Sequence, residues 1–164
     1  MTNTPAYNIS LLFVEDNDTL RFLYNKLLAG KVRSFYIAEN GQEGLEQYRL
    51  HKPDLIITDI SMPVMDGLQM ISHIKRENPE VKVVVMSAYS IKEYFLEAIN
   101  LGVNGYLIKP VEASRIFSII ADLADKFLCA SSSKRKRATA VRPKKTSSVR
   151  WAKKTSCCVR YTTA

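Results

Sequence analysis

The chain alternates between short apolar runs and longer segments in which apolar residues recur every three or four positions. The short runs are rich in β-branched residues, as is typical of strands that are buried on both faces of a sheet. Each is followed by a segment with helical periodicity, and the last helix should extend from about residue 112 to 128. The predicted strands cover residues 9–14, 34–38, 54–58, 81–86 and 104–108.

Residues that favour helix ends stand between these segments. Asn17 or Asp18 can cap the first helix, Asp66 the third and Ser90 the fourth, because their short side chains accept hydrogen bonds from free backbone N–H groups. Gly30 is expected to stop the first helix. Five strand–helix units therefore follow one another without a long unpatterned gap.

Strands that alternate with helices predict an α/β fold in which helices cover both faces of a parallel sheet. Right-handed crossovers leave few topologies for such a chain. Ligands of open parallel sheets bind outside the carboxyl ends of the strands. The residues that directly follow each predicted strand are therefore the candidates for function.

Composition and charge divide the 164 residues into two parts. Residues 131–164 hold eleven Lys or Arg and no acidic residue, whereas residues 1–130 hold 13 basic and 16 acidic side chains, a net charge of −3. We predict an extension at residues 1–7, a folded domain at 8–128 and a basic, disordered tail at 129–164.

Several classes of protein are disfavoured by what the sequence lacks. Three late cysteines and two histidines argue against a disulfide framework and a zinc site. No apolar run approaches the roughly 20 residues of a membrane helix, and the N-terminus has no pattern of a secretory signal. We expect a cytoplasmic location.

Chemistry-bearing side chains follow four of the five predicted strands. Glu15 and Asp16 follow the first strand, Asp59 the third, Ser87 the fourth and Lys109 the fifth. Three carboxylates at one edge repel one another and favour a divalent cation, and an all-oxygen ligand set favours Mg²⁺ or Mn²⁺ over zinc. A carboxylate beside a metal can be a nucleophile toward phosphorus, and a lysine and a hydroxyl can hold phosphoryl oxygens. The set predicts a magnesium-dependent phospho-acceptor site.

Each of these residues also has a simpler interpretation. A single acidic residue after a strand is often only a helix cap, and a lone Lys109 would be a solvated surface lysine. The Lys109–Pro110 pair can be merely a turn, or a cis bond that aims the lysine inward. The full set at one edge favours a site.

The ordered set resembles the receiver domain of two-component response regulators. The resemblance rests on Glu15-Asp16, on Asp59 with Met62-Pro63 and Asp66-Gly67, on Ser87-Ala88 and on Lys109-Pro110, and it covers about residues 8–128. It implies a flavodoxin-like (βα)5 fold with a five-stranded parallel sheet of order 2-1-3-4-5. It also implies a signalling switch that catalyses only its own phosphorylation and dephosphorylation.

The resemblance implies a role for each site residue. Asp59 would accept a phosphoryl group from a histidine kinase or a histidine phosphotransfer protein. Glu15, Asp16 and Asp59 would bind Mg²⁺ together with the backbone carbonyl of Ser61, and Lys109 would pair with the phosphoryl group.

A switch toward partners is implied as well. Ser87 takes the position of the switch hydroxyl and Tyr106 that of the switch aromatic, which together change the face formed by the fourth helix, the fifth strand and the fifth helix. Tyr89 could shield the phosphoryl group or belong to a partner-binding face. The implied partners are a downstream effector or output domain and a second copy of the chain in a phosphorylation-dependent homodimer.

Three rival functions remain to be weighed. A phosphatase or phosphotransferase with an aspartyl nucleophile would carry a second Asp where this chain has Ser61. A flavodoxin would need a phosphate-binding loop rich in Ser, Thr and Gly where this chain has residues 15–18, which are mostly acidic. A structural pseudo-receiver would lack an acceptor-site residue, and none is missing here.

The basic tail has three interpretations. It is a solvated extension, a segment that binds nucleic acid or another anionic surface weakly and nonspecifically by counterion release, or a segment foreign to the domain such as a shortened linker or a shifted reading frame. No helix-turn-helix pattern supports sequence-specific DNA binding.

Overall fold

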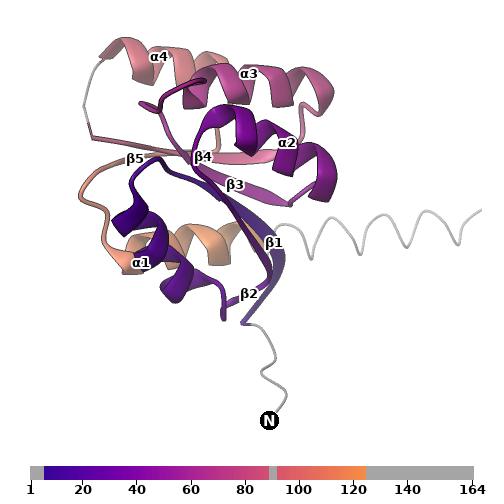
Figure 1. Ribbon diagram of the computed structural model, residues 1–164, viewed down its shortest axis with the longest axis vertical. Helices are drawn as coiled ribbons and strands as arrows, with labels where there is room; N and C mark the ends of the chain where they lie inside the picture. Colours follow the sequence, from indigo (N-terminus) through magenta and orange to yellow (C-terminus); the bar gives the residue numbers. More distant parts are fainter. Residues whose placement is uncertain (1–5, 89–91, 125–164) are drawn as a thin grey trace, which may run out of the picture.

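The computed structural model describes residues 6–88 and 92–124. Helices and strands alternate throughout this part of the chain (Figure 1). A helix at residues 113–124 follows the last strand. The strands are β1 (Tyr7–Val14), β2 (Val32–Ala38), β3 (Leu55–Asp59), β4 (Lys82–Ser87) and β5 (Gly105–Ile108), and the labelled helices are α1 (Asp18–Leu28), α2 (Gly41–His51), α3 (Gly67–Glu77) and α4 (Lys92–Asn100).

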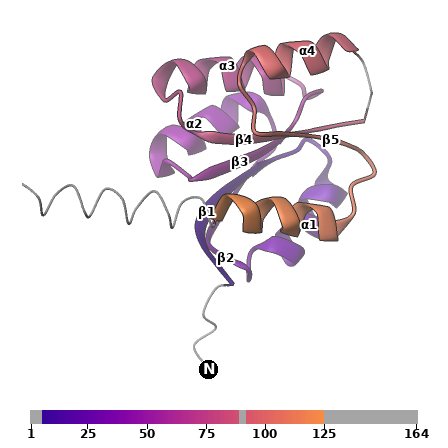
Figure 2. The ribbon, with the colours of Figure 1, turned by 180° about the vertical axis from the view of Figure 1, so that it is seen from behind.

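The five strands form one parallel sheet in the order β2-β1-β3-β4-β5. Helices α2, α3 and α4 cover one face, whereas α1 and the helix at residues 113–124 cover the other, as the view from behind also shows (Figure 2). The prediction of a flavodoxin-like fold with strand order 2-1-3-4-5 is confirmed.

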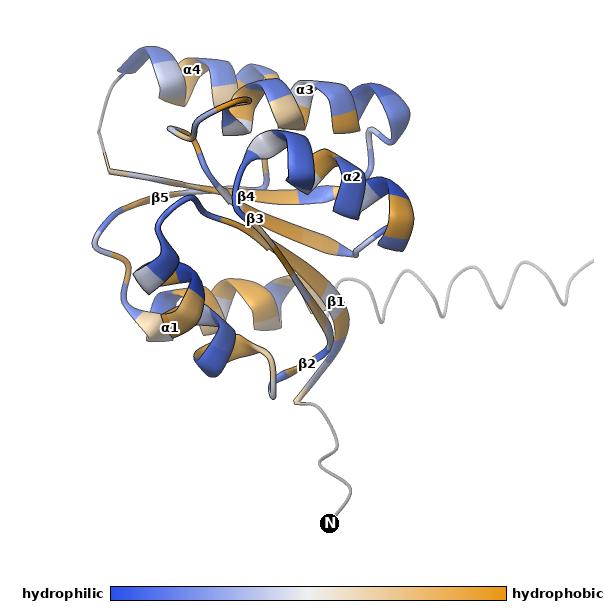
Figure 3. Cartoon of the chain, in the orientation of Figure 1, coloured by the Kyte–Doolittle hydropathy of each residue, from blue (hydrophilic) through white to orange (hydrophobic). Residues whose placement is uncertain are grey.

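Alternate residues of the central strands enter two separate cores, one on each face of the sheet. In β1, Leu12 and Val14 belong to the core under α2 and α3, and Leu11 and Phe13 to the core under α1. Because side chains alternate across a strand, a strand between two cores must be apolar at every position. Figure 3 shows the result, with mostly hydrophobic strands between helices that carry both hydrophilic and hydrophobic residues.

Two strands extend one residue further than the apolar pattern predicts. Asp59 ends β3 and pairs with Met86, while Ser87 ends β4 and pairs with Ile108. Backbone pairing continues past the last apolar side chain, because the hydrogen-bonded ladder does not depend on side-chain polarity. The two polar residues are thereby held by regular strands instead of loops.

The predicted helix caps are formed wherever the structure describes them. Asn17 accepts a hydrogen bond from Leu20 N at 3.1 Å, and Asp66 accepts one from Gln69 N at 2.8 Å. Helix α1 ends at Leu28, two residues before Gly30. Ser90, Tyr89, the end of the predicted last helix at 125–128 and the basic tail lie outside the described residues.

Candidate functional site

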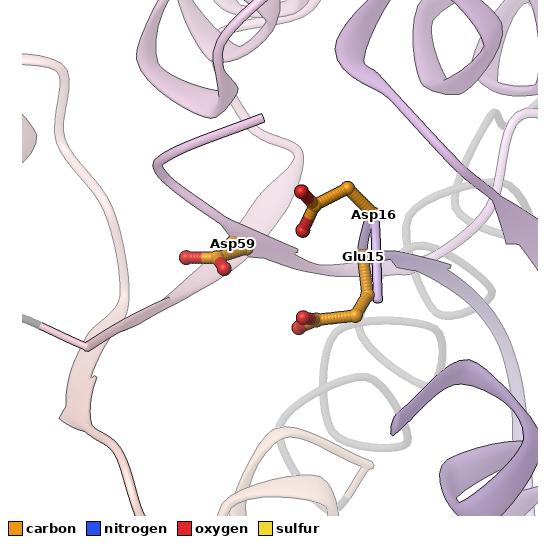
Figure 4. A group of neighbouring side chains, drawn as sticks. All are labelled: Glu15, Asp16 and Asp59. Carbon is orange, nitrogen blue, oxygen red and sulfur yellow. The ribbon is translucent and has the colours of Figure 1, made fainter. Parts of the chain in front are cut away.

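The site lies at the carboxyl ends of β1 and β3, which are neighbours in the sheet. Val14 pairs with Thr58, so the residues that follow, Glu15 and Asp59, come side by side. Glu15 and Asp59 are buried and Asp16 is exposed. Figure 4 shows Glu15 and Asp16 extending from the end of β1 toward Asp59.

The three carboxylates form a group that can hold a metal ion. One oxygen from each of Glu15, Asp16 and Asp59 lies within 4.8 Å of the others. Carboxylate oxygens at this spacing suit a hard divalent cation, and the exposed Asp16 keeps one side of the cluster open to solvent. The donor set therefore fits the cation that the sequence predicts.

Lys109 reaches this cluster from the other side of β4. Its backbone N–H donates to the carbonyl of Ser87 at 2.7 Å, which attaches the residue to the end of β4. Its Nζ lies 2.7 and 2.9 Å from the two carboxylate oxygens of Glu15 and 2.7 Å from Oδ2 of Asp59. The peptide bond to Pro110 is cis. The ammonium group of Lys109 bridges the two buried acids, Glu15 and Asp59.

Burial and charge act in opposite directions on this group. Burial raises the pKa of Glu15, and the carboxylates of Asp59 and Asp16 raise it further, while hydrogen bonding to Lys109 lowers it. Burial lowers the pKa of Lys109, but its hydrogen bonds to Asp59 and Glu15 outweigh that effect and the net pKa is raised. Lys109 therefore stays charged, and its charge opposes the effect of burial on Glu15.

The backbone around Asp59 is held tightly as well. Oδ1 of Asp59 accepts a hydrogen bond from the N–H of Ile60 at 2.6 Å. Gly67 N donates to the carbonyl of Ile60 at 2.9 Å, which folds the loop at residues 60–66 back against β3. A Cβ atom on Gly67 would lie 2.0 Å from the carbonyl oxygen of Asp59, so only glycine permits this closure.

The predicted switch residues lie on the neighbouring strands. Ser87 is buried at the end of β4, and Tyr106 lies on β5, paired with Val85. The ring of Tyr106 is half-buried and makes a T-shaped contact with Phe95 on α4, with ring centroids 5.3 Å apart. Ser87 and Tyr106 thus lie on adjacent strands, and the Tyr106 ring contacts α4.

Ser61 lies in the loop just after β3, and its role as a ligand through its carbonyl stays a prediction. The structure also brings in a residue that the sequence analysis did not select. Arg21, in the first turn of α1, donates hydrogen bonds to the carbonyls of Glu15 and Asp16. The sequence signal was only its position five residues after the acidic pair.

Comparison with known proteins agrees with this geometry. The response regulator receiver domain family matches residues 11–121. The chain is 30% identical over 113 residues to the chemotaxis protein CheY of Halobacterium salinarum, with 69% of this chain and 94% of that protein covered. It is 37% identical over 105 residues to the transcriptional regulatory protein ZraR of Escherichia coli, with 64% of this chain but only 24% of that protein covered.

Solved structures give the same fold. The N-terminal domain of an uncharacterized protein from Wolinella succinogenes (WS1339) has a TM-score of 0.72 and 36% identity, with 74% of this chain and 98% of that chain covered. A CheY-like receiver domain protein from Methanospirillum hungatei has a TM-score of 0.69 and 23% identity, with 73% and 95% covered, which supports the fold alone.

The chain belongs to the response regulator receiver domain family, the phospho-accepting signalling switches of two-component systems. Within the described residues, no helix is long and apolar enough to cross a membrane.

Proposed function

We propose that Asp59 is the phospho-acceptor of this receiver domain and that Mg²⁺ or Mn²⁺ bound by Glu15, Asp16 and Asp59 is required for the transfer. The observation that carries this proposal is the contact between Lys109 and both buried acids at 2.7 Å. This contact supports the proposal because the carboxylate that would act as the nucleophile, the acids that would bind the cation and the positive charge of Lys109 all belong to one cluster.

The proposed transfer is a substitution at phosphorus. A carboxylate oxygen of Asp59 forms the new P–O bond, while the P–N bond of a phosphohistidine breaks and its electron pair goes to the imidazole of the kinase or phosphotransfer protein. When bound, the divalent cation neutralises charge on the phosphoryl oxygens and the carboxylates. Hydrolysis of the aspartyl phosphate by water restores Asp59, so that the chain catalyses only its own phosphorylation and dephosphorylation.

Lys109 supplies the positive charge that the transition state needs. Its ammonium group already lies at hydrogen-bonding distance from Asp59, where a phosphoryl oxygen on that carboxylate would come within reach. Because the backbone N–H of Lys109 donates to the carbonyl of Ser87, the backbones of these two residues keep a fixed relation to each other. The Lys109 ammonium and the Ser87 hydroxyl would both contact phosphoryl oxygens rather than the imidazole that leaves.

The output would pass through the face formed by α4, β5 and the helix at residues 113–124. Ser87 and Tyr106 each need two arrangements, so that phosphorylation shifts a two-state equilibrium at this face. A partner that prefers one state, which can be an effector, an output domain or a second copy of the chain, then reads the signal. The match to all but a few residues of CheY and to a quarter of ZraR is compatible with a receiver that acts alone or within a longer regulator.

The experiment is intact-mass measurement after incubation with a small-molecule phosphodonor. The wild type should gain one phosphoryl group in the presence of Mg²⁺ and none after chelation, whereas Asp59→Asn should gain none under either condition. Asp54→Asn is a matched control, since Asp54 lies at the opposite end of β3 and pairs with Arg33. Labelling of Asp59→Asn to the level of the wild type would contradict the assignment.

A further inference from the structure

Arg21 lies next to the two metal-binding acids, although its own side chain points at their backbone. The guanidinium Nη1 lies 2.7 Å from the carbonyl oxygen of Glu15 and 2.9 Å from that of Asp16. Nη2 contacts the carboxylate of Asp18 and lies 3.8 Å from that of Glu39. The side chain is only 15% exposed, so these contacts hold it in one place.

These hydrogen bonds act where the strand no longer holds the chain. The ladder of β1 ends at Val14, and the N–H of Glu15 still donates to the carbonyl of Ala38 at 3.1 Å. Beyond that point the direction of each carbonyl fixes the rotation of its peptide unit, and with it the direction of the adjoining side chains. An arginine that binds two successive carbonyls therefore restrains the backbone from which the side chains of Glu15 and Asp16 extend.

We propose that Arg21 is a positioning residue for the cation site, a role that rests on the proposed function of that site. It holds the peptide units of Glu15 and Asp16 so that both carboxylates converge with Asp59. The planar guanidinium is suited to this task because it presents several N–H groups in a fixed fork, whereas a lysine is a single point of charge.

The positioning role and a simple charge effect predict opposite changes in Mg²⁺ affinity when Arg21 is replaced. A guanidinium close to the cluster repels a divalent cation, so removal of its charge alone would strengthen Mg²⁺ binding. Loss of the two carbonyl hydrogen bonds would instead let the acids diverge and weaken binding. Groups that orient metal ligands typically change metal affinity by roughly 10- to 100-fold when they are removed.

The test is Mg²⁺ titration, followed by NMR, of the wild type and of Arg21→Gln and Arg21→Lys. Arg33→Gln is the charge-matched control, because Arg33 pairs with Asp54 at the other end of the sheet. We expect both Arg21 variants to bind Mg²⁺ about 10-fold or more weakly, the control to bind as the wild type does, and excess Mg²⁺ to restore phosphorylation. If Arg21→Gln fails to fold, Arg21→Lys still decides the question, since it keeps the charge.

A second measurement separates this inference from the proposed function. In the absence of Mg²⁺, the amide of Glu15, which donates to the carbonyl of Ala38, should exchange with solvent faster in Arg21→Lys than in the wild type. Affinity equal to or tighter than that of the wild type in both Arg21 variants would overturn the positioning role. A wild type that binds no Mg²⁺ would contradict the proposed function instead. In that case, faster amide exchange in Arg21→Lys would still show that Arg21 holds the backbone after β1. Unchanged amide exchange would overturn the positioning role of Arg21.

Discussion

The substitution Gly67→Ala should destabilise the domain, although alanine is normally the better helix residue. Gly67 begins α3, and a Cβ built on it would lie 2.0 Å from the carbonyl oxygen of Asp59 and 3.1 Å from Oγ1 of Thr58. The first atom belongs to the backbone of β3 and cannot turn aside. The loop at residues 60–66 or the end of β3 must therefore move.

The magnitude follows from two opposing contributions. Overpacking of a well-packed interior costs about 1–3 kcal/mol. Replacing glycine by alanine where the backbone permits it stabilises by about 0.4–1 kcal/mol, which offsets part of that loss. We expect a net loss of about 1–2 kcal/mol, or a melting temperature lower by roughly 3–12 °C for a domain of this size.

The assay is thermal and urea unfolding followed by far-ultraviolet circular dichroism, because the single tryptophan, Trp151, lies outside the described residues. Gly30→Ala is the matched control, since a Cβ there meets nothing within 4 Å and the backbone is not left-handed. That variant should be as stable as the wild type or slightly more stable. Equal stability of Gly67→Ala and Gly30→Ala would refute the argument from the close approach to Asp59.

Three further predictions concern the loop, the switch and the tail. Val64 has a left-handed backbone (φ = 69°) that a β-branched residue disfavours and asparagine tolerates, and its side chain is 84% exposed. Val64→Asn should therefore raise the free energy of unfolding in urea by about 1 kcal/mol. A lower urea midpoint than that of the wild type would contradict backbone strain at Val64. Ser87→Ala should still be phosphorylated on Asp59 but should lose most of the NMR chemical-shift change that phosphorylation causes at Tyr106. Shift changes in Ser87→Ala equal to those of the wild type would exclude coupling from Asp59 to Tyr106 through Ser87. Truncation after Ala130 should leave the melting temperature and phosphorylation unchanged and should abolish binding to duplex DNA. In the full-length chain, the DNA affinity should fall by about 0.9 log units per log unit of salt for each phosphate neutralised. DNA binding that does not weaken with salt would instead indicate a folded functional unit in the tail.

The fold could be predicted because strands between two hydrophobic cores need apolar residues on both faces, and this produces continuous apolar runs in the sequence. Residues 9–14 are apolar at nearly every position, as a strand between two helical layers must be, and the interruption at Glu15 and Asp16 marks the strand end. Parallel strands end at one edge, so their terminal residues had to converge. That argument needs only the order of the elements and not their atomic positions.

Contacts that depend on side-chain direction could not be predicted in this way. The reach of Lys109 across the end of β4 to Glu15 requires the register of three strand pairs and the path of the chain after β5. The contact of Arg21 with two carbonyls leaves no trace in residue types, because backbone acceptors are the same at every position. The left-handed backbone at Val64 likewise contradicts the preference of a β-branched residue.

The central claim, that Asp59 carries the phosphoryl group, is tested most directly by trapping and locating the acyl phosphate. Borohydride reduces an aspartyl phosphate to homoserine, which peptide mass spectrometry assigns to one residue. After incubation with a phosphodonor and Mg²⁺, homoserine should be found at position 59 and at no other acidic residue. Homoserine at position 16, or phosphoryl transfer that leaves position 59 unreduced, would contradict the account.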